Sequence, residues 1–132
     1  MKGKPTNPKE SIGTDKLPLS IIPEIALAEE SLAFVEGALK YGKSNYCTAG
    51  ARASIYIDAL LRHVSKYNGG EDRDAKTGIH HLASARACAA VILDASIRNI
   101  LTDDRPPVNK ALSQAIDDLS QRVLHLKKVL KK

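Results

Sequence analysis

Carboxylates and imidazoles gather in one short stretch of the chain, DALLRHVSKYNGGEDRDAKTGIHH, at residues 58–81. Glu71 and Asp74 follow a pair of glycines, and His63 and His81 lie on either side of them. These side chains bind hard divalent cations and transfer protons, and a loop that only joined two helices would not need them. The sequence therefore predicts a functional site in this stretch.

Three acidic side chains within four positions, those of Glu71, Asp72 and Asp74, offer the oxygen ligands that Mg²⁺ or Mn²⁺ prefers. Asp58, on the helix expected before the loop, is a candidate for a further carboxylate ligand. The alternative is a solvated loop whose acidic groups only stabilise the start of the next helix through its dipole. The metal prediction rests on Glu71, Asp74 and Asp58.

The two histidines of this stretch have different expected surroundings. His81 shares a helical stripe with Ser84 and Cys88, so it should face a neighbouring helix. There it is either a ligand or proton-transfer group or a hydrogen-bonded core residue. His63 borders the apolar stripe of the preceding helix, one turn before the acidic loop. His80 projects about 100° away from His81 and is the weaker candidate.

Groups suited to phosphate lie in two further places. Arg62, four residues after Asp58, either forms a surface ion pair with it or acts as a fork for phosphate oxygens. The segment KYGKSNY at residues 40–46 offers ammonium groups, an amide and two rings beside a glycine turn, which suits a nucleotide. No phosphate-loop, dinucleotide-binding, serine-hydrolase or zinc-protease motif occurs.

The composition favours an all-α protein. Of the 132 residues, 43% are hydrophobic but only 4% aromatic, so the core must be built from Ala, Leu, Ile and Val, which close-packed helices favour. Cys47 and Cys88 fit neither a metal-ligand spacing nor a disulfide framework. No apolar run has the length of a signal peptide or a membrane span, so we expect a soluble cytoplasmic protein with no membrane partner.

The net charge of +5 comes from the ends of the chain. The first 16 residues carry +2 and the four lysines of residues 127–132 carry +4, which leaves −1 for residues 17–126. A surface that follows nucleic-acid phosphates would need its cations on the folded body. The charge distribution therefore argues against a nucleic-acid partner.

Four long helices are expected after a flexible N-terminal arm at residues 1–19. Periodicity and helix-stop signals predict them over residues 20–41, 51–67, 78–100 and 108–130. Thr77 is the expected cap of the third helix, and Pro106 and Pro107 cannot continue it. The predicted architecture is a four-helix bundle-like single domain, with three helices in a helical domain at residues 20–105 and the fourth as an amphipathic helix in residues 106–132.

The last two helices have distinctive patterns. The third is so rich in alanine that neighbours could approach it on more than one face, which predicts a central position. The fourth carries a heptad seam, whose members are Leu112, Ile116, Leu119, Val123, Leu126 and Leu130. This seam either closes the domain's own bundle or pairs with a second copy of the chain.

A family resemblance rests on three runs of the sequence. They are DKLPLSIIP, GALKYGKSNY and DALLRHVSKYNGGEDRDAKTGIHHLASA, and they resemble the small phage-associated dATP/dGTP diphosphohydrolase domain, whose members read roughly KxPLSLLP, GAxKYGxxNW and ALRHLxxWxxGExxDxxSGxxHLxHA. The matching positions are Lys40, Tyr41, Gly42, Asn45, Arg62, His63, Gly70, Glu71, Asp74, Gly78 and His81. Three positions depart from the pattern: Tyr46 replaces a tryptophan, Ser84 a second histidine and Cys88 an asparagine.

The resemblance implies metal-dependent hydrolysis of a purine deoxynucleoside triphosphate to monophosphate and pyrophosphate, in the bacterial host cytoplasm. Taken with the chemistry of the residues themselves, it leads us to expect catalytic roles for His81, His63 and Glu71 and substrate contacts from Lys40, Tyr41, Asn45 and Arg62. Binding of Mg²⁺ or Mn²⁺ by Glu71, Asp74 and Asp58 is expected from their carboxylate chemistry. We also expect a homo-oligomer. The alternative is a non-catalytic helical interaction or nucleotide-sensing module that dimerises through its C-terminal helix.

Overall fold

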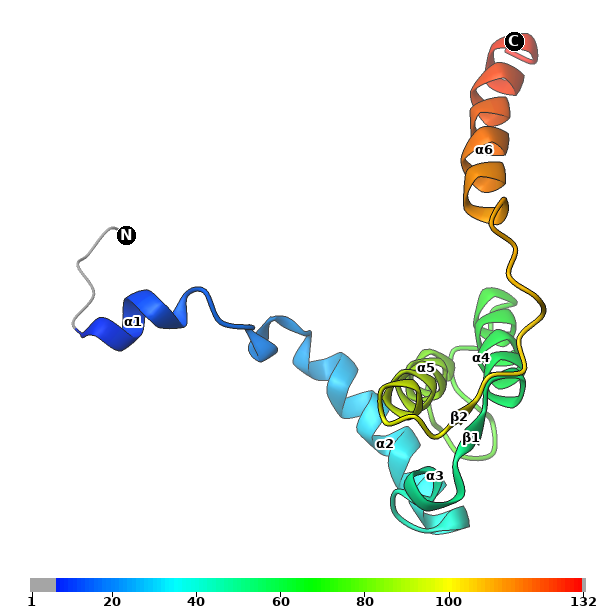
Figure 1. Ribbon diagram of the computed structural model, residues 1–132. Helices are drawn as coiled ribbons and strands as arrows, with labels where there is room; N and C mark the ends of the chain where they lie inside the picture. The colour runs from blue at the N-terminus through cyan, green and yellow to red at the C-terminus, as the bar shows by residue number, and fades with distance from the viewer. Residues whose placement is uncertain (1–6, 132) are drawn as a thin grey trace.

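The structure is a computed structural model that describes residues 7–131, so residues 1–6 of the predicted arm lie outside it. Figure 1 shows its elements in chain order. They are α1 (Pro8–Gly13), a 3₁₀ turn (Leu19–Ile21), α2 (Glu24–Tyr41), α3 (Asn45–Ala49), β1 (Ala51–Arg52), α4 (Ala53–Asn68), α5 (His81–Ile97), β2 (Leu101–Thr102) and α6 (Leu112–Val129). The all-α prediction is confirmed. None of these helices combines the length and the hydropathy that crossing a bilayer requires.

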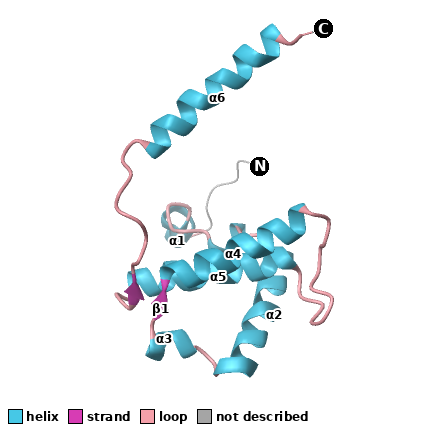
Figure 2. Cartoon of the chain, turned by 90° about the vertical axis from the view of Figure 1, so that its right-hand side faces the viewer, coloured by secondary structure: helices cyan, strands magenta, loops and turns pink. Residues whose placement is uncertain are grey.

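The alanine-rich helix α5 is central, as predicted, because it packs against both α2 and α4 (Figures 1 and 2). Ala83 lies in one buried cluster with Ala33 of α2 and Ile79 of the preceding loop. Ala95 lies in a second cluster with Ala51 and Val91. Short side chains at these positions let the helix backbones approach closely, so alanine fixes the helix spacing.

The start of α5 differs from the prediction. The expected cap, Thr77, lies three residues before the N-cap, which is His80. The Nδ1 atom of His80 accepts a hydrogen bond from the backbone N–H of Leu82 at 3.0 Å. The Thr77 hydroxyl instead accepts from the backbone N–H of Ile79 at 3.3 Å, inside the loop. The prediction that Thr77 caps this helix was therefore wrong.

Two short strands, β1 and β2, join the chain after α5 to the chain before α4. They pair in parallel, with Ala51 opposite Leu101. Gly50 precedes β1 with φ of +80°, and a Cβ atom there would approach the carbonyl oxygen of Ile100 to 3.0 Å. Only glycine satisfies both conditions without strain. A pairing of two residues per strand leaves no alternating pattern, which is why the sequence did not predict it.

The heptad helix α6 lies apart from the packed helices (Figures 1 and 2). It is not among the elements that pack closely on one another in the described residues. Its six seam side chains are between 50% and 68% exposed. The first of the two predicted uses of the seam, packing on the chain's own bundle, is not seen in this structure.

The close packing of α5 makes a prediction about stability. Replacing Ala83 with leucine should lower the free energy of unfolding by about 1–3 kcal/mol, because the added atoms have no space between α5 and α2. Urea denaturation followed by circular dichroism measures this change. The control is Ala89→Leu on the exposed side of the same helix, which should stay within about 0.5 kcal/mol of the parent. Equal effects of the two substitutions would contradict the packing argument.

Candidate active site

Asp74 organises the loop between α4 and α5. Its Oδ1 atom accepts hydrogen bonds from the backbone N–H groups of Lys76 and Thr77, both at 2.9 Å, and from the Thr77 hydroxyl at 3.3 Å. The two backbone hydrogen bonds hold the pKa of the Asp74 carboxyl below its usual value. Asp74 therefore stabilises the turn that carries the rest of the loop.

An ion pair fixes the same loop against α2. The Arg73 guanidinium donates to the two carboxylate oxygens of Glu29, at 2.7 and 3.1 Å, and to the carbonyl oxygen of Gly78 at 3.1 Å. Such an exposed pair adds little to stability, but its two parallel hydrogen bonds restrict the orientation of the Arg73 guanidinium relative to Glu29. The loop is thus held at its middle by α2, while its acidic beginning, with Glu71, lies near the start of α5.

His81 connects that loop to α4 through a completely buried ring. Its exposed fraction is 0%, and each of its two nitrogens has a partner. Nε2 lies 3.0 Å from Oε1 of Glu71, and Nδ1 lies 3.0 Å from Nδ1 of His63. Glu71, His81 and His63 therefore form a continuous hydrogen-bonded chain from the solvent-exposed loop to α4.

The chemistry of these groups fixes the direction of the hydrogen bonds. An ionised carboxylate only accepts, so Nε2 of His81 must donate to Glu71. In a neutral His81 ring, Nδ1 then accepts, and Nδ1 of His63 must donate to it. This arrangement leaves Nε2 of His63 with a free lone pair. His63 is consequently oriented as a proton acceptor.

The surroundings keep the His63 ring neutral. Partial burial lowers the pKa of His63 below its ordinary value of 6.5, and the nearby His81, Lys66 and Arg62 lower it further, against a smaller opposite effect of Glu36. A neutral imidazole near pH 7 is the form that can take up a proton.

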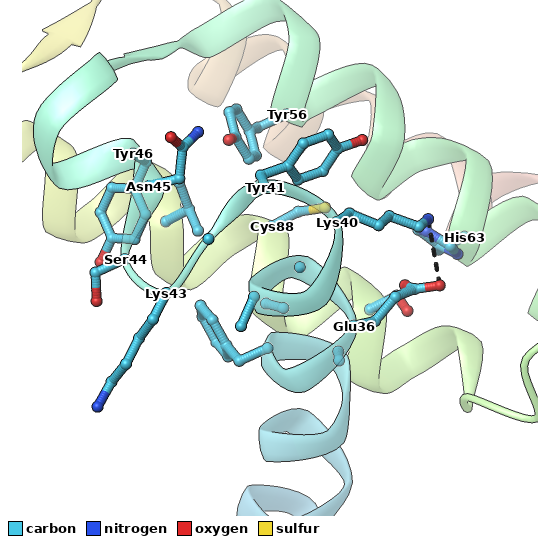
Figure 3. Close-up of a pocket in the computed structure, with 18 residues that line it drawn as sticks. Glu36, Lys40, Tyr41, Lys43, Ser44, Asn45, Tyr46, Tyr56, His63 and Cys88 are labelled. Carbon is cyan, nitrogen blue, oxygen red and sulfur yellow. Dashed lines mark ion pairs between the residues drawn. The ribbon is translucent and has the colours of Figure 1, made fainter.

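His63 lies on the wall of a cavity of about 450 Å³ formed by α2, α3, α4 and α5. Figure 3 shows the cavity-lining side chains, with Lys40 and Glu36 beside His63 and with Tyr41 and Tyr56 further along the wall. Nζ of Lys40 lies 3.3 Å from a carboxylate oxygen of Glu36. The size is within the range of small-molecule sites. The wall offers cationic, amide, hydroxyl and aromatic groups.

One aromatic residue of the cavity wall, Tyr46, is fixed by a hydrogen bond of its hydroxyl group. The hydroxyl of Tyr46 donates to Oδ2 of Asp94 at 2.5 Å, and Nε of Arg98 donates to the same oxygen at 2.8 Å. The hydrogen bond to Asp94 raises the pKa of Tyr46, so the phenol stays protonated. Asp94 and Arg98 lie four residues apart on α5, and their ion pair positions a ring of the cavity.

The structure brings together part of the predicted site. Glu71, His81 and His63 form one chain, and the predicted substrate residues Lys40, Tyr41 and Asn45 line the cavity with His63. All three positions that depart from the family pattern also line this cavity, and they are Tyr46, Ser84 and Cys88. Burial raises the pKa of the Cys88 thiol, which keeps it protonated.

Other predicted residues lie elsewhere. Asp58 and Arg62 are both exposed on α4, and no ion pair joins them. Arg62 is outside the cavity lining, although its charge acts on both His63 and Cys88. Asp74 serves the loop turn described above.

The predicted metal ligands do not form a binding group. Within residues 7–131, no set of three or more His, Cys, Asp or Glu side chains is placed to hold a metal ion. Oδ1 of Asp74 accepts hydrogen bonds within the turn, the Glu71 carboxylate is hydrogen-bonded to His81, and Asp58 lies on α4. The ligand set of Glu71, Asp74 and Asp58 therefore does not fit a metal as the side chains lie.

Two lining residues with polar side chains, Tyr56 and Glu36, were missed by the sequence reasoning. Tyr56 lies seven residues before His63, so both occupy one face of α4, and that spacing could have identified it. Glu36 lies four residues before Lys40, which places their side chains together in the same way. Spacings of seven and four residues occur on every helix, so they identify site residues only once the position of a cavity is known.

The fold and the site together define a helical domain with a small-molecule cavity and a carboxylate–imidazole chain centred on the buried His81 ring. The chain belongs to the family described as dATP/dGTP diphosphohydrolase, N-terminal, whose model matches residues 6–105. It is also 32% identical over 90 residues to a dATP/dGTP diphosphohydrolase of Salmonella phage PMBT28. That match covers 68% of this chain but only 30% of the length of the relative. No solved structure matches the chain significantly.

The electrostatic account of His63 can be tested by NMR titration of the imidazole. The pKa of His63 should lie below 6.5, because burial disfavours the charged ring. Lys66→Gln should raise this pKa and Glu36→Gln should lower it, since the first removes a positive and the second a negative neighbour. Shifts of the same sign in both variants would contradict the account.

Proposed function

We propose that this domain hydrolyses a purine deoxynucleoside triphosphate to the monophosphate and pyrophosphate. The observation that carries the proposal is the hydrogen-bonded chain from Glu71 through His81 to His63, which ends on the wall of the cavity. Membership of the family, together with the name of the phage relative, supports the substrate class.

In this proposal His63 is the general base. Its Nε2 atom takes a proton from a water molecule, the water oxygen forms a bond to the α-phosphorus, and the bond from that phosphorus to the bridging oxygen breaks to release pyrophosphate. The positive charge that develops on His63 is stabilised by Glu71 through the His81 ring. General-base assistance of this kind typically contributes 10²–10⁴-fold to the rate.

The cavity wall offers partners for each part of the substrate. Lys40 and Lys43 can offset phosphate charge, and the rings of Tyr41, Tyr46 and Tyr56 can pack against the base. Lys40 would exchange its ion pair with Glu36 for one with phosphate, which keeps the ammonium group paired in both states. Phosphoryl transfer needs such positioning and charge neutralisation more than covalent chemistry.

Dependence on Mg²⁺ or Mn²⁺ is a separate part of the proposal. Because the described side chains form no ready ligand group, we propose that the cation enters as a complex with the substrate's phosphates. Its contribution there is to neutralise phosphate charge.

A panel of nucleoside triphosphates, with pyrophosphate and orthophosphate scored separately, tests this function. With Mg²⁺ or Mn²⁺ we expect dATP and dGTP to yield monophosphate and pyrophosphate, and excess chelator should abolish the reaction. Release of orthophosphate alone would contradict the proposed bond cleavage. Full activity in chelator would contradict only the metal dependence.

Substitutions test the roles in the hydrogen-bonded chain. His63→Ala should lower kcat by about 10²–10⁴-fold, since it removes the base. Glu71→Gln should lower kcat by a smaller factor, because it weakens the stabilisation of charged His63 without removing the ring. Steady-state kinetics with dATP or dGTP measure both.

The matched control is His80→Asn. It removes a neighbouring imidazole but keeps a side chain that can cap α5, and His80 does not line the cavity. We expect its kcat to stay within about twofold of the parent. Unchanged turnover in His63→Ala, in a variant with parent-like circular dichroism, would remove His63 from the mechanism.

A further inference from the structure

The chain exposes much more surface than a folded monomer of its size should. Its accessible area is 11058 Å². A compact monomer of 14.3 kDa is expected to expose about 6,800 Å². The difference of roughly 4,000 Å² is as large as the area that obligate oligomers bury. Large apolar side chains contribute to this surface, among them Leu39 of α2 and Leu119 of α6, and exposed apolar patches mark sites where a partner binds.

Helix α6 supplies a continuous part of this surface. Its seam consists of leucine, isoleucine and valine side chains whose spacing alternates between four and three residues. The helix that carries them is about 27 Å long. Leu119 and Val123, at the centre of the seam, are 65% and 50% exposed. Most of the stability of a helix in a protein comes from packing of its apolar face, so a partner on the seam would stabilise α6.

We propose that α6 pairs with α6 of a second copy of this chain, in antiparallel orientation. A heptad seam is complementary to a second copy of itself. In a two-fold symmetric dimer, the same surface of each copy forms the contact. The steps of four and three read the same in both directions. Leu119 would therefore pack against the partner's Val123, with equivalent layers on both sides of this centre.

The charges on α6 decide the orientation. Asp117 and Asp118 lie in its first half, while Arg122, Lys127 and Lys128 lie in its second half. A parallel pair would place Arg122 beside the partner's Lys127 twice, and would gather the cations of both copies at one end. An antiparallel pair leaves one contact of this kind, between the two copies of Arg122 near the centre, and places each acidic half beside a basic half, so like-charge repulsion is reduced.

Light scattering coupled to size-exclusion chromatography of the full chain tests the pairing. The parent should show twice the mass of 14.3 kDa, and Leu119→Asp should halve it. The control Gln121→Asp adds the same charge on the opposite side of α6 and should leave the mass unchanged. Because α6 lies apart from the domain, the Leu119→Asp chain should keep the rest of its circular dichroism signal. A monomeric parent, or an unchanged mass in Leu119→Asp, would overturn the proposal.

Disulfide trapping tests the orientation and the identity of the partner surface. In a background with Cys47→Ala and Cys88→Ala, an equimolar mixture of Leu119→Cys and Val123→Cys chains should form mixed disulfide dimers. Either variant alone should crosslink at least tenfold less. Efficient crosslinking of each variant to itself would indicate a parallel pair and overturn the proposal. Absence of any crosslink in a dimeric protein would also overturn it, since another surface would then cover α6.

Discussion

The site depends on a buried imidazole that needs a hydrogen-bond partner on each side. His81 is fully removed from solvent, so leaving either of its nitrogens unpaired would cost free energy. Glu71 satisfies one nitrogen and His63 the other. The carboxylate orients the His81 ring and the His81 ring orients the His63 ring, so the burial of His81 sets the direction of the hydrogen-bonded chain. Any change that opens the contact between α4 and α5 would break this chain.

The geometry of that contact comes from the small side chains of α5. Ala83 and Ala95 let α2 and α4 approach α5 closely, and within residues 7–131 His81 is the largest side chain that is fully buried. The loop before α5 completes the arrangement, because Asp74 closes its turn and Arg73 fixes it to Glu29. The acidic loop therefore has two tasks: most of its polar groups hold its shape, and Glu71 takes part in the site.

Sequence reasoning could predict the elements better than their contacts. Apolar periodicity and glycine stops gave α2, α4 and α5 with ends within a few residues, because those signals are local. The expected burial of His81 followed from its helical stripe. The pairing of His81 with His63 could not be predicted, since 18 residues separate them and only packing brings them together. Likewise, an aspartate that closes a turn and one that binds a cation look the same in sequence, so the turn-closing hydrogen bonds of Asp74 could not be predicted.

The proposed chemistry and the proposed self-association use different parts of this chain. The family model matches residues 6–105, which contain the cavity and the His81 chain, and α6 begins beyond that match at Leu112. Since α6 shares no close packing with the described domain, covering its seam leaves the wall of the cavity unchanged. A pair of domains joined only through α6 would then retain two independent cavities. Cooperativity between them would require a second contact, and the outer face of α2 exposes suitable apolar side chains, including Ile25 and Leu39.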